Sequence, residues 1–248
     1  MGYLLNPYTL IPNIVLDSLE LYLDPSNIDS YPGSGTTLFD LSGNSRSGAI
    51  QGSPTYTDPY FTFDGNTQRI YTTYSGPNNL FSDGSGSWST CSWFRCPVSR
   101  TSNGTANASN MILGRGGGIG GQATYATFVQ TPDQGTYGTP NTLAVVLRGS
   151  ITQISPSTIN DNEWHHVSVT WDGTTAKTYL DGEFRTNASV GTAAVQSNLL
   201  SMGDNGGTTI STAHAWEGDL SQALVYSKAL TAQEVEQNFN SMKSVFGL

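Results

Sequence analysis

Charged residues are scarce in this chain, and positively charged residues are the scarcest. Only 12% of the 248 residues are charged, with 10 Lys and Arg against 19 Asp and Glu, so the formal net charge is −9 at pH 7. An acidic surface repels phosphate backbones and anionic lipid headgroups. The composition therefore predicts no nucleic-acid partner and no membrane partner, whereas acidic loops leave open a structural calcium ion.

The chain also lacks long hydrophobic runs and a recognisable secretion signal. No stretch reaches the roughly 18 apolar residues that a membrane-spanning helix needs. The apolar start of the chain is interrupted by Asn6, Pro7 and Pro12, and the first basic residue is Arg46. A signal peptide begins with a basic segment. We therefore expect a protein made in a cytoplasm, with no signal peptide and no transmembrane segment.

Cysteine is nearly absent, and its two residues are placed where they cannot pair. Cys91 and Cys96 lie in the segment WSTCSWFRC, which has the pattern of one β-strand. An offset of five residues puts two side chains on opposite faces of a strand, with their α-carbons about 16 Å apart. A disulfide requires less than about 7 Å between α-carbons. We predict two free thiols.

Turn residues and aromatic residues are abundant, with 28 Gly, 11 Pro, 12 Tyr, 9 Phe and 5 Trp. Short runs that alternate apolar and polar residues lie between the turns, among them LELYLD, RIYTTY, NTLAVVLRG and HHVSVTWDG. Many short strands at this spacing are typical of a sandwich or barrel. Asp172-Gly173 and Asp181-Gly182 are hairpin signals that predict a three-stranded meander over residues 164–187. No linker divides the chain, which indicates one main domain.

One helix is expected, in the closing segment LTAQEVEQNFNSMKSVF. Thr231 and Glu234 have the spacing of a capping box, which marks the start of a helix. Val235, Phe239 and Met242 follow at helical spacing and give one apolar face. We predict that this face is buried against the sandwich, so that Phe239→Ala costs roughly 3 kcal/mol or more.

The adjacent histidines of the segment WHHVSVTW raise the question of a metal or catalytic site. Side chains alternate across a strand, so His165 and His166 point to opposite faces and cannot ligate one metal ion from a regular strand. The third histidine, His214, has no Cys or His neighbour at ligand spacing. We interpret the pair as structural, with hydrogen bonds at the start of a strand.

A glycine motif matches a nucleotide-binding pattern without the structure that this pattern needs. Gly116, Gly118 and Gly121 fit G-x-G-x-x-G, but the alternating segment ATYATFVQ follows them, where a dinucleotide site requires a helix. We interpret these glycines as a hairpin loop. No G-x-S-x-G elbow flags an activated serine either. The sequence therefore predicts no cofactor.

The segment EGDLSQ resembles the E-x-D-x-x-E motif of laminarinase-type glucanases. It places Glu217, Asp219 and Gln222 at the three motif positions. Retaining hydrolysis needs one carboxylate as the nucleophile and a second carboxyl group as the general acid. Gln222 has no titratable proton and cannot be that acid. The sequence therefore predicts that the protein is not an enzyme.

Several segments together carry a resemblance to a known family. They are LELYLDPSNIDSYPGSGTTLFDLSGNSRSGAIQGSPTY, FTFDG, WSTCSWFRC, NEWHHVSVTWDGTTAKTYLDGE and GDLSQALVYSKALTAQEVEQNF. In this order and spacing they resemble a laminin-G-like domain of the concanavalin A-like lectin/glucanase superfamily, from about Leu16 onward. The resemblance implies an all-β fold, a jelly-roll sandwich of two antiparallel sheets with one short C-terminal helix.

Within that superfamily the chain is most similar to laminin-G-like proteins encoded by tailed bacteriophages, cyanophages among them. The resemblance implies a non-enzymatic virion protein, on the capsid, tail or fibre, held by contacts with other virion proteins or with its own copies. Ser221 and Gln222 replace an acidic pair that the family often carries, and Asn66, Thr67 and Gln68 follow the FDG segment where a further acid is common. Both departures argue against a bound calcium ion.

A glycan-binding lectin that attaches the particle to host polysaccharide is the alternative function. Sugars stack an apolar face on an aromatic ring and form hydrogen bonds at their rim, so a lectin needs exposed rings beside amides or carboxylates. The loop residues with this chemistry are Trp216, Tyr137, Asp204 and Asn205. The competing interpretation of all four is ordinary loop packing.

Residues 1–15 precede the resemblance and form a separate N-terminal segment, ahead of a domain over residues 16–248. The segment is apolar and has no charged residue. In water its side chains would form the kind of apolar patch that marks an interface. Pro7 and Pro12 disfavour a continuous helix, so we expect it to be extended. It docks on a neighbouring subunit or packs back on its own sandwich, and the sequence leaves both alternatives open.

Overall fold

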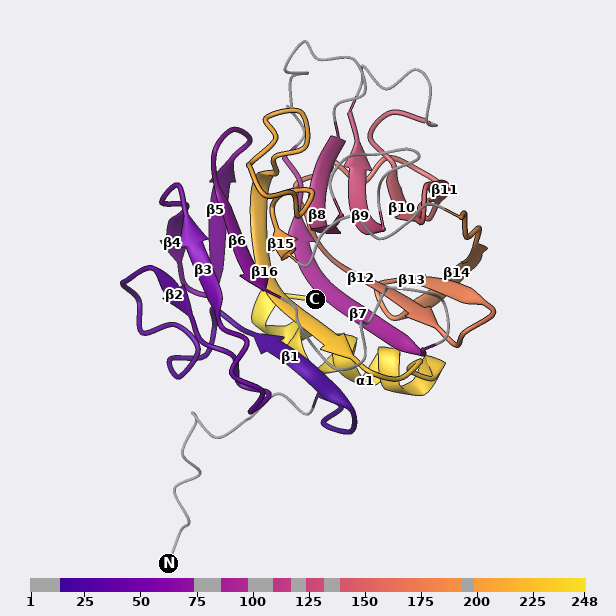
Figure 1. The fold of residues 1–248 in the computed structure, drawn as a ribbon, viewed down its shortest axis with the longest axis horizontal. Helices are drawn as coiled ribbons and strands as arrows, with labels where there is room; N and C mark the ends of the chain where they lie inside the picture. Colours follow the sequence, from indigo (N-terminus) through magenta and orange to yellow (C-terminus); the bar gives the residue numbers. More distant parts are fainter. Residues whose placement is uncertain (1–13, 74–85, 98–108, 117–123, 132–138, 193–198) are drawn as a thin grey trace, which may run out of the picture.

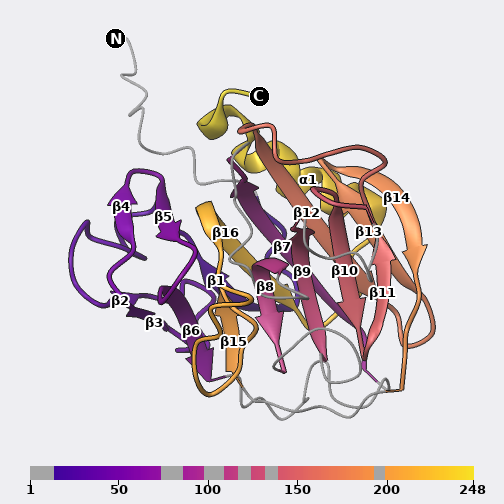
Figure 2. The ribbon, with the colours of Figure 1, turned by 90° about the horizontal axis from the view of Figure 1, so that it is seen from above.

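The computed structural model describes residues 14–73, 86–97, 109–116, 124–131, 139–192 and 199–248. These residues form two eight-stranded antiparallel sheets that lie face to face (Figures 1 and 2). The first sheet consists of β1 (Leu19–Leu23), β4 (Thr55–Thr57), β5 (Tyr60–Asp64), β7 (Trp88–Arg95), β12 (Trp164–Trp171), β13 (Ala176–Leu180), β14 (Glu183–Ala188) and β16 (Glu217–Tyr226). The second sheet consists of β2 (Thr37–Leu38), β3 (Gly48–Gln51), β6 (Arg69–Thr73), β8 (Ser109–Arg115), β9 (Tyr125–Gln130), β10 (Leu143–Leu147), β11 (Ser150–Gln153) and β15 (Leu199–Met202).

The strand order interleaves segments from both ends of the chain. The first sheet runs β14-β13-β12-β7-β16-β5-β4, with β1 also paired to β16, and the second runs β11-β10-β9-β8-β15-β6-β3-β2. The expected all-β sandwich of two antiparallel sheets with one short C-terminal helix is thereby confirmed. The predicted meander is confirmed as β12, β13 and β14. At its second turn Asp181 and Gly182 have φ of 54° and 81°, which is the left-handed pair that a tight hairpin turn requires.

The main core lies between the two sheets and follows from the alternation of side chains along the strands. On β12, Val167, Val169 and Trp171 face this core, whereas His166 and Ser168 lie on the other face of the sheet. Burial of such apolar side chains is the main favourable contribution to folding. The second sheet covers one face of the first sheet, and the C-terminal helix packs on the other face.

Helix α1 (Ala232–Met242) covers the outer face of the first sheet and continues into the 3-10 helix η1 (Lys243–Phe246) (Figure 2). The capping box between Thr231 and Glu234 is present, as predicted. Val235 and Met242 are fully buried, which confirms their predicted role. For the third residue the prediction is confirmed in part: Phe239 packs against the sheet, stacked on Trp93 with ring centroids 5.5 Å apart, but it is only half-buried.

The end of the N-terminal segment belongs to the packing beneath this helix. Ile14 and Val15 are buried in one apolar cluster with Tyr226 and Val235. The backbone N–H of Val15 donates to Oδ1 of the buried Asn238 at 2.9 Å. The domain packing therefore includes the last two residues of the segment assigned to 1–15, and residues 1–13 lie outside the described part of the chain.

The two cysteines are buried and form no disulfide bond with each other, as predicted. Cys91 belongs to the cluster beneath helix α1, whereas Cys96 belongs to the core between the sheets. The opposite faces expected from their offset thus correspond to two different apolar regions. In the described ranges there is no helix that combines the length and the apolar character required to cross a membrane.

Candidate binding site

The loop residues selected from the sequence for glycan binding are buried where the structure describes them. Trp216 has 0% of its surface exposed and packs edge-on against Phe94, with ring centroids 5.9 Å apart. Asp204 is 0% and Asn205 8% exposed. A ring enclosed in the core offers no face to a sugar, so these three residues fit the competing interpretation of loop packing. Tyr137 lies outside the described residues.

Asp204 fastens its loop onto the outer face of the second sheet. Its Oδ2 lies 3.2 Å from NH1 of Arg69, which also donates to the carbonyl of Gly207 at 2.8 Å. Burial raises the pKa of Asp204, against the opposing effects of backbone N–H donors and of Arg69. A Cβ added to Gly114 on β8 would come within 2.5 Å of the Asp204 carbonyl oxygen, so the loop lies directly on that strand.

Strand β16, which carries Glu217 and Asp219, does not place two carboxyl groups in the roles that glycoside hydrolysis requires. The carboxylate of Asp219 accepts hydrogen bonds from Nε of Arg95 at 2.7 Å and from the hydroxyl of Thr62 at 2.6 Å. Gln222 is buried and its amide points to Asp24, at 3.4 Å. Asp219 thus links β16 to β5 and β7 through its hydrogen bonds. The neutral amide of Gln222 occupies the motif position where hydrolysis needs a general acid.

The histidine pair is divided between two surroundings, as the alternation predicted. Nδ1 of His165 lies 2.9 Å from Oδ2 of Asp181, and its Nε2 lies 3.3 Å from the carboxylate of Asp161. Burial lowers the pKa of His165, but the hydrogen bond to Asp181 and the two negative charges outweigh it and raise the pKa. His166 is buried against Trp93 on the opposite face.

His165 therefore joins the β13–β14 turn to the loop that precedes β12. Asp181 adds a second hydrogen bond between the turn and β12, because its other carboxylate oxygen accepts the backbone N–H of His166 at 2.8 Å. Across the described residues no group of His, Cys, Asp and Glu side chains has an arrangement that could hold a metal ion.

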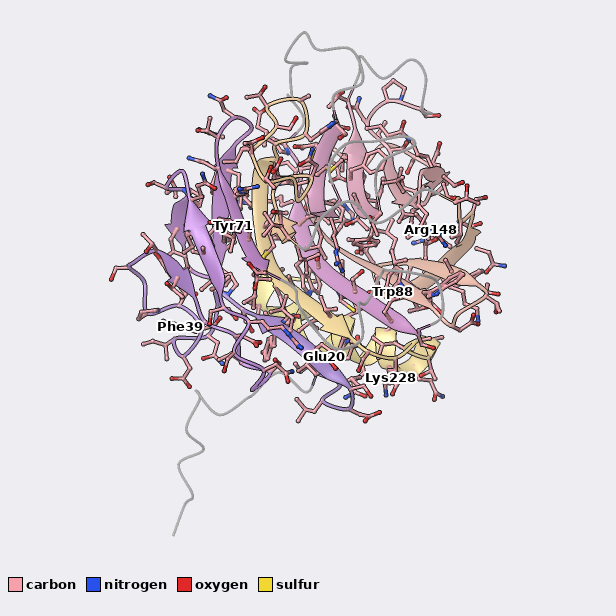
Figure 3. The ribbon with its side chains drawn as sticks, in the orientation of Figure 1. Glu20, Phe39, Tyr71, Trp88, Arg148 and Lys228 are labelled. Atoms are coloured by element: carbon pink, nitrogen blue, oxygen red, sulfur yellow. The ribbon has the colours of Figure 1, made fainter. Side chains whose placement is uncertain are left out.

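An open polar pocket of about 380 Å³ lies where the loop before β3 meets the end of β6. Its lining consists of Asn44, Ser45, Arg46, Ser47, Thr72 and Thr73. Figure 3 labels Tyr71 on β6 and Glu20 on β1, the two strands to which this loop is bonded. A second cleft, beside Asn110 and Gln130, has no room for a water molecule.

The loop that lines the pocket, residues 40–47, is organised by one carboxylate. Asp40 accepts hydrogen bonds from the backbone N–H groups of Tyr22, Ser42 and Arg46, at 2.9 to 3.0 Å. The side-chain amide of Asn44 donates to the carbonyl of Glu20 at 3.2 Å. These bonds fix the loop against the edge of β1 that does not pair with β16.

Arg46 connects the loop to both sheets, and its charge is compensated. Its NH1 donates to the carboxylate and to the carbonyl oxygen of Glu20, both at 2.7 Å. The hydroxyl of Thr72 donates to the carbonyl of Arg46 at 2.9 Å. The pocket therefore combines amide and hydroxyl groups with a guanidinium that is already ion-paired.

The pocket was not predicted from the sequence. The segment DLSGNSRSG carries a usable signal, since an Asp at the start of a run of Ser, Gly and Asn is typical of a turn organised by its carboxylate. The other wall gives no such signal. Thr72 and Thr73 are ordinary strand residues, and they meet the loop because β3 and β6 are paired.

Comparison with known proteins agrees with this architecture. The family model described as the concanavalin A-like lectin/glucanases superfamily, in its laminin-G form, matches residues 64–236. The chain is 33% identical over 86 residues to the sushi, von Willebrand factor type A, EGF and pentraxin domain-containing protein 1 of Rattus norvegicus. That match covers 32% of this chain and 2% of the much longer relative.

Solved structures with the same fold include receptor-binding domains of toxins. The binding domain of Paraclostridial Mosquitocidal Protein 1 matches with a TM-score of 0.63 and 16% identity, over 91% of this chain and 52% of that one. The binding domain of botulinum neurotoxin DC, solved in complex with rat synaptotagmin II, matches with a TM-score of 0.61 and 15% identity, over 92% and 52%. The same domain was also solved in complex with SialylT, with a TM-score of 0.60, 15% identity and the same coverage. The chain spans about half the length of these structures, and at such identities the likeness concerns the fold.

Proposed function

We propose that this chain, which belongs to the concanavalin A-like lectin/glucanases superfamily, is a non-catalytic binding module on the surface of a virion. It is held there by contacts with other virion proteins or with its own copies. The fold is widely used for binding, and its function has to be argued from the sites that a particular chain carries.

One observation supports the non-catalytic part of this proposal most strongly. In the superfamily's glucanase motif, Asp219 is ion-paired to Arg95 and Gln222 replaces the acid. Retaining hydrolysis requires two carboxyl groups about 5 to 5.5 Å apart with separate roles. Asp219 is ion-paired and Gln222 cannot act as the acid, which leaves Glu217 without the second carboxyl group that the reaction requires, so we infer that the protein contributes binding surface.

The virion part of the proposal is supported by the resemblance to phage-encoded laminin-G-like proteins, carried by the segments EWHHVSVTWDG, YLDGE and VYSKALTAQEV. It is tested by mass spectrometry of density-purified particles of the phage whose genome carries the gene. Peptides of this chain are expected at a stoichiometry typical of a structural protein. Their absence from particles that contain the other structural proteins would contradict the assignment.

The non-catalytic part is tested with the purified protein. Incubation with laminarin, agar, alginate and sialosides is expected to release no reducing ends and no free sialic acid. The matched variant is Glu217→Gln, which removes the remaining motif carboxylate that Arg95 does not neutralise. Release by the natural chain that disappears in this variant would establish hydrolysis and overturn the proposal.

Glycan binding is the second candidate function, and the polar pocket at residues 44–47 favours it. The binding domain of botulinum neurotoxin DC, which has a similar fold, has been solved in complex with SialylT. That binding is a property of the toxin domain, and it shows only that a protein with this fold can bind such a ligand. Trp216, Asp204 and Asn205 are buried, so a glycan site in the described part of the chain would use residues other than these three. A virion module that binds host polysaccharide would perform both functions at once.

A further inference from the structure

We infer that the polar pocket formed by Asn44, Ser45, Arg46, Ser47, Thr72 and Thr73 binds a neutral sugar residue. The inference rests on the glycan-binding candidate of the proposed function and gives it a site. The volume of the pocket, about 380 Å³, lies at the lower end of the range of roughly 300–1,000 Å³ that small-molecule sites occupy. A site of this size accepts one terminal or branching residue of a longer polysaccharide.

The chemistry of the lining favours a neutral polyol. Hydroxyl groups donate and accept hydrogen bonds, and an amide offers both functions on one side chain, which matches the alternating donors and acceptors of a sugar. A phosphate or carboxylate ligand would need an uncompensated cation, whereas the guanidinium of Arg46 is paired with Glu20 at 2.7 Å. The net charge of −9 further disfavours an anionic ligand.

Tyr71 on β6 does not line the pocket, but it precedes the two threonines that do. Tyr71 and Thr73 are two residues apart on β6 and therefore share one face of the second sheet. Tyr71 is half-buried, and the guanidinium carbon of Arg69 lies 4.5 Å from its ring centroid, which fixes the ring. On this face the tyrosine ring and the hydroxyl of Thr73 are two residues apart along the strand, so a longer polysaccharide bound in the pocket has an aromatic side chain on the same face.

The pocket is formed before a ligand arrives. Asp40 holds the loop through several backbone N–H groups, and Thr72 fastens the loop to β6. Ser45 adopts a φ of 57°, an uncommon value for a residue other than glycine, which these bonds maintain. A preformed site loses little conformational entropy on binding, which matters for a ligand that forms few contacts.

The test is a titration of the ¹⁵N-labelled full chain, followed by amide chemical shifts, with D-glucose, D-galactose, D-mannose, L-rhamnose and N-acetylglucosamine as probes at millimolar concentration. At least one sugar is expected to give saturable shifts at residues 44–47 and 72–73. Thr73→Trp, which fills the pocket from its exposed wall, is expected to abolish them. Thr73→Val removes the hydroxyl and should weaken binding roughly fivefold, and Thr73→Ser should restore it.

The matched control is Thr57→Trp on the edge strand β4, which places the same exposed side chain outside the pocket and should leave the affinity unchanged. Melting midpoints show that each variant is folded. Saturable shifts at other residues, or an unchanged affinity in Thr73→Trp, would overturn the site while leaving glycan binding as a function. Absence of shifts with all five sugars would overturn the inference, whereas the virion role depends on the particle analysis alone.

Discussion

The imidazole of His166, on strand β12, lies beneath helix α1, with the rings of Trp93 and Phe239 at centroid distances of 5.1 and 5.9 Å. Neither of its ring nitrogens has a hydrogen-bond partner among the described residues. Burial lowers the pKa of this imidazole to about 4, because a charged ring would be stripped of water without compensation. Its neighbour His165 has the opposite tendency, since two carboxylates raise its pKa.

The depressed pKa of His166 makes the stability depend on pH. Between pH 6.5 and pH 4 the unfolded chain binds a proton at His166 and the folded state does not. The contribution of the neutral imidazole to the unfolding free energy is therefore complete above the ordinary pKa of 6.5 and is lost as the pH falls toward 4. This difference corresponds to roughly 3 kcal/mol of unfolding free energy. In His166→Leu we expect a flatter decline of the melting midpoint between pH 7 and pH 4.5.

His165→Gln is the control for this prediction and has the opposite sign. A raised folded-state pKa contributes stability below the ordinary pKa, and that contribution disappears as the pH rises through the folded-state pKa. The variant should therefore lose more stability at pH 5.5 than at pH 8.5. An unchanged acid decline in His166→Leu would show that other groups control the transition.

The sequence predicts these two histidines well and Asp219 poorly, for one physical reason. Side chains alternate along a regular strand, so opposite faces for His165 and His166 follow from adjacency alone. The partner of Asp219 is Arg95, 124 positions away in the chain. Only the pairing of β7 with β16 brings the two together, and no local pattern encodes that pairing.

At the scale of elements, the buried face of helix α1 differs from the apolar face predicted from the sequence. Its start follows from the capping box, which is a local signal. The buried positions are Val235, Asn238 and Met242, so the face is centred on Asn238, with Phe239 at its margin. A polar residue in this place is not expected from an apolar pattern, and its role emerges from the hydrogen bonds it forms across three elements.

Asn238 is expected to be the costliest polar residue of the helix to replace. Its amide donates to the hydroxyl of Tyr226 at 3.0 Å and accepts the backbone N–H of Val15 at 2.9 Å. Asn238→Ala leaves these buried groups unpaired and should lower the unfolding free energy by about 1–3 kcal/mol in urea denaturation. Asn240→Ala, at an exposed position of the same helix, should change it by less than about 0.5 kcal/mol. Equal effects of the two substitutions would contradict a stabilising role for the hydrogen bonds of Asn238.

The apolar residues of the helix give a second prediction. Met242 is fully buried, so Met242→Ala should cost about 2–5 kcal/mol. Phe239 is half-buried and stacked on Trp93, so Phe239→Ala should cost less than the roughly 3 kcal/mol that full burial implies. Both values come from the same denaturation series. A larger loss for Phe239→Ala than for Met242→Ala would place the centre of the interface at Phe239.

Elements defined by local signals were predictable, and the pocket was not. The β12–β13–β14 meander follows from two Asp-Gly turns, and the sandwich follows from the spacing of short strands. The pocket needs the loop at residues 40–47 to be tied to β1 of one sheet while Thr72 belongs to the other. That approach is a property of the tertiary fold, which strand patterns do not specify.

At the scale of the whole molecule, the N-terminal segment separates into two parts with different expected roles. Ile14 and Val15 are buried beneath helix α1, whereas we propose that residues 1–13 dock on a neighbouring subunit. Deleting residues 1–13 should abolish particle incorporation or self-association and leave the melting midpoint of the isolated chain unchanged. Deleting residues 1–15 should also lower the midpoint, because it removes two core side chains.

The two deletions distinguish docking from intramolecular packing. Calorimetry measures the midpoint, and analytical ultracentrifugation together with particle analysis measures assembly. A collapsed transition in the chain that lacks only residues 1–13 would mean that this part packs on its own sandwich. Normal assembly by the same chain would show that the interface lies elsewhere.

Strand β16 lies near the middle of the first sheet and is the last strand in the described part of the chain. It pairs with β7 on one side and with β5 and β1 on the other, so that Leu23 lies opposite Ala223. While a ribosome synthesises the chain, β1 and β5 emerge first and have no partner in this position until β16 follows. Pairing between segments so distant in sequence is slow, because the loop must close before its contacts form. The first sheet therefore closes only after Glu217–Tyr226 has been synthesised, and a polypeptide released before Glu217 lacks the strand that joins its two halves.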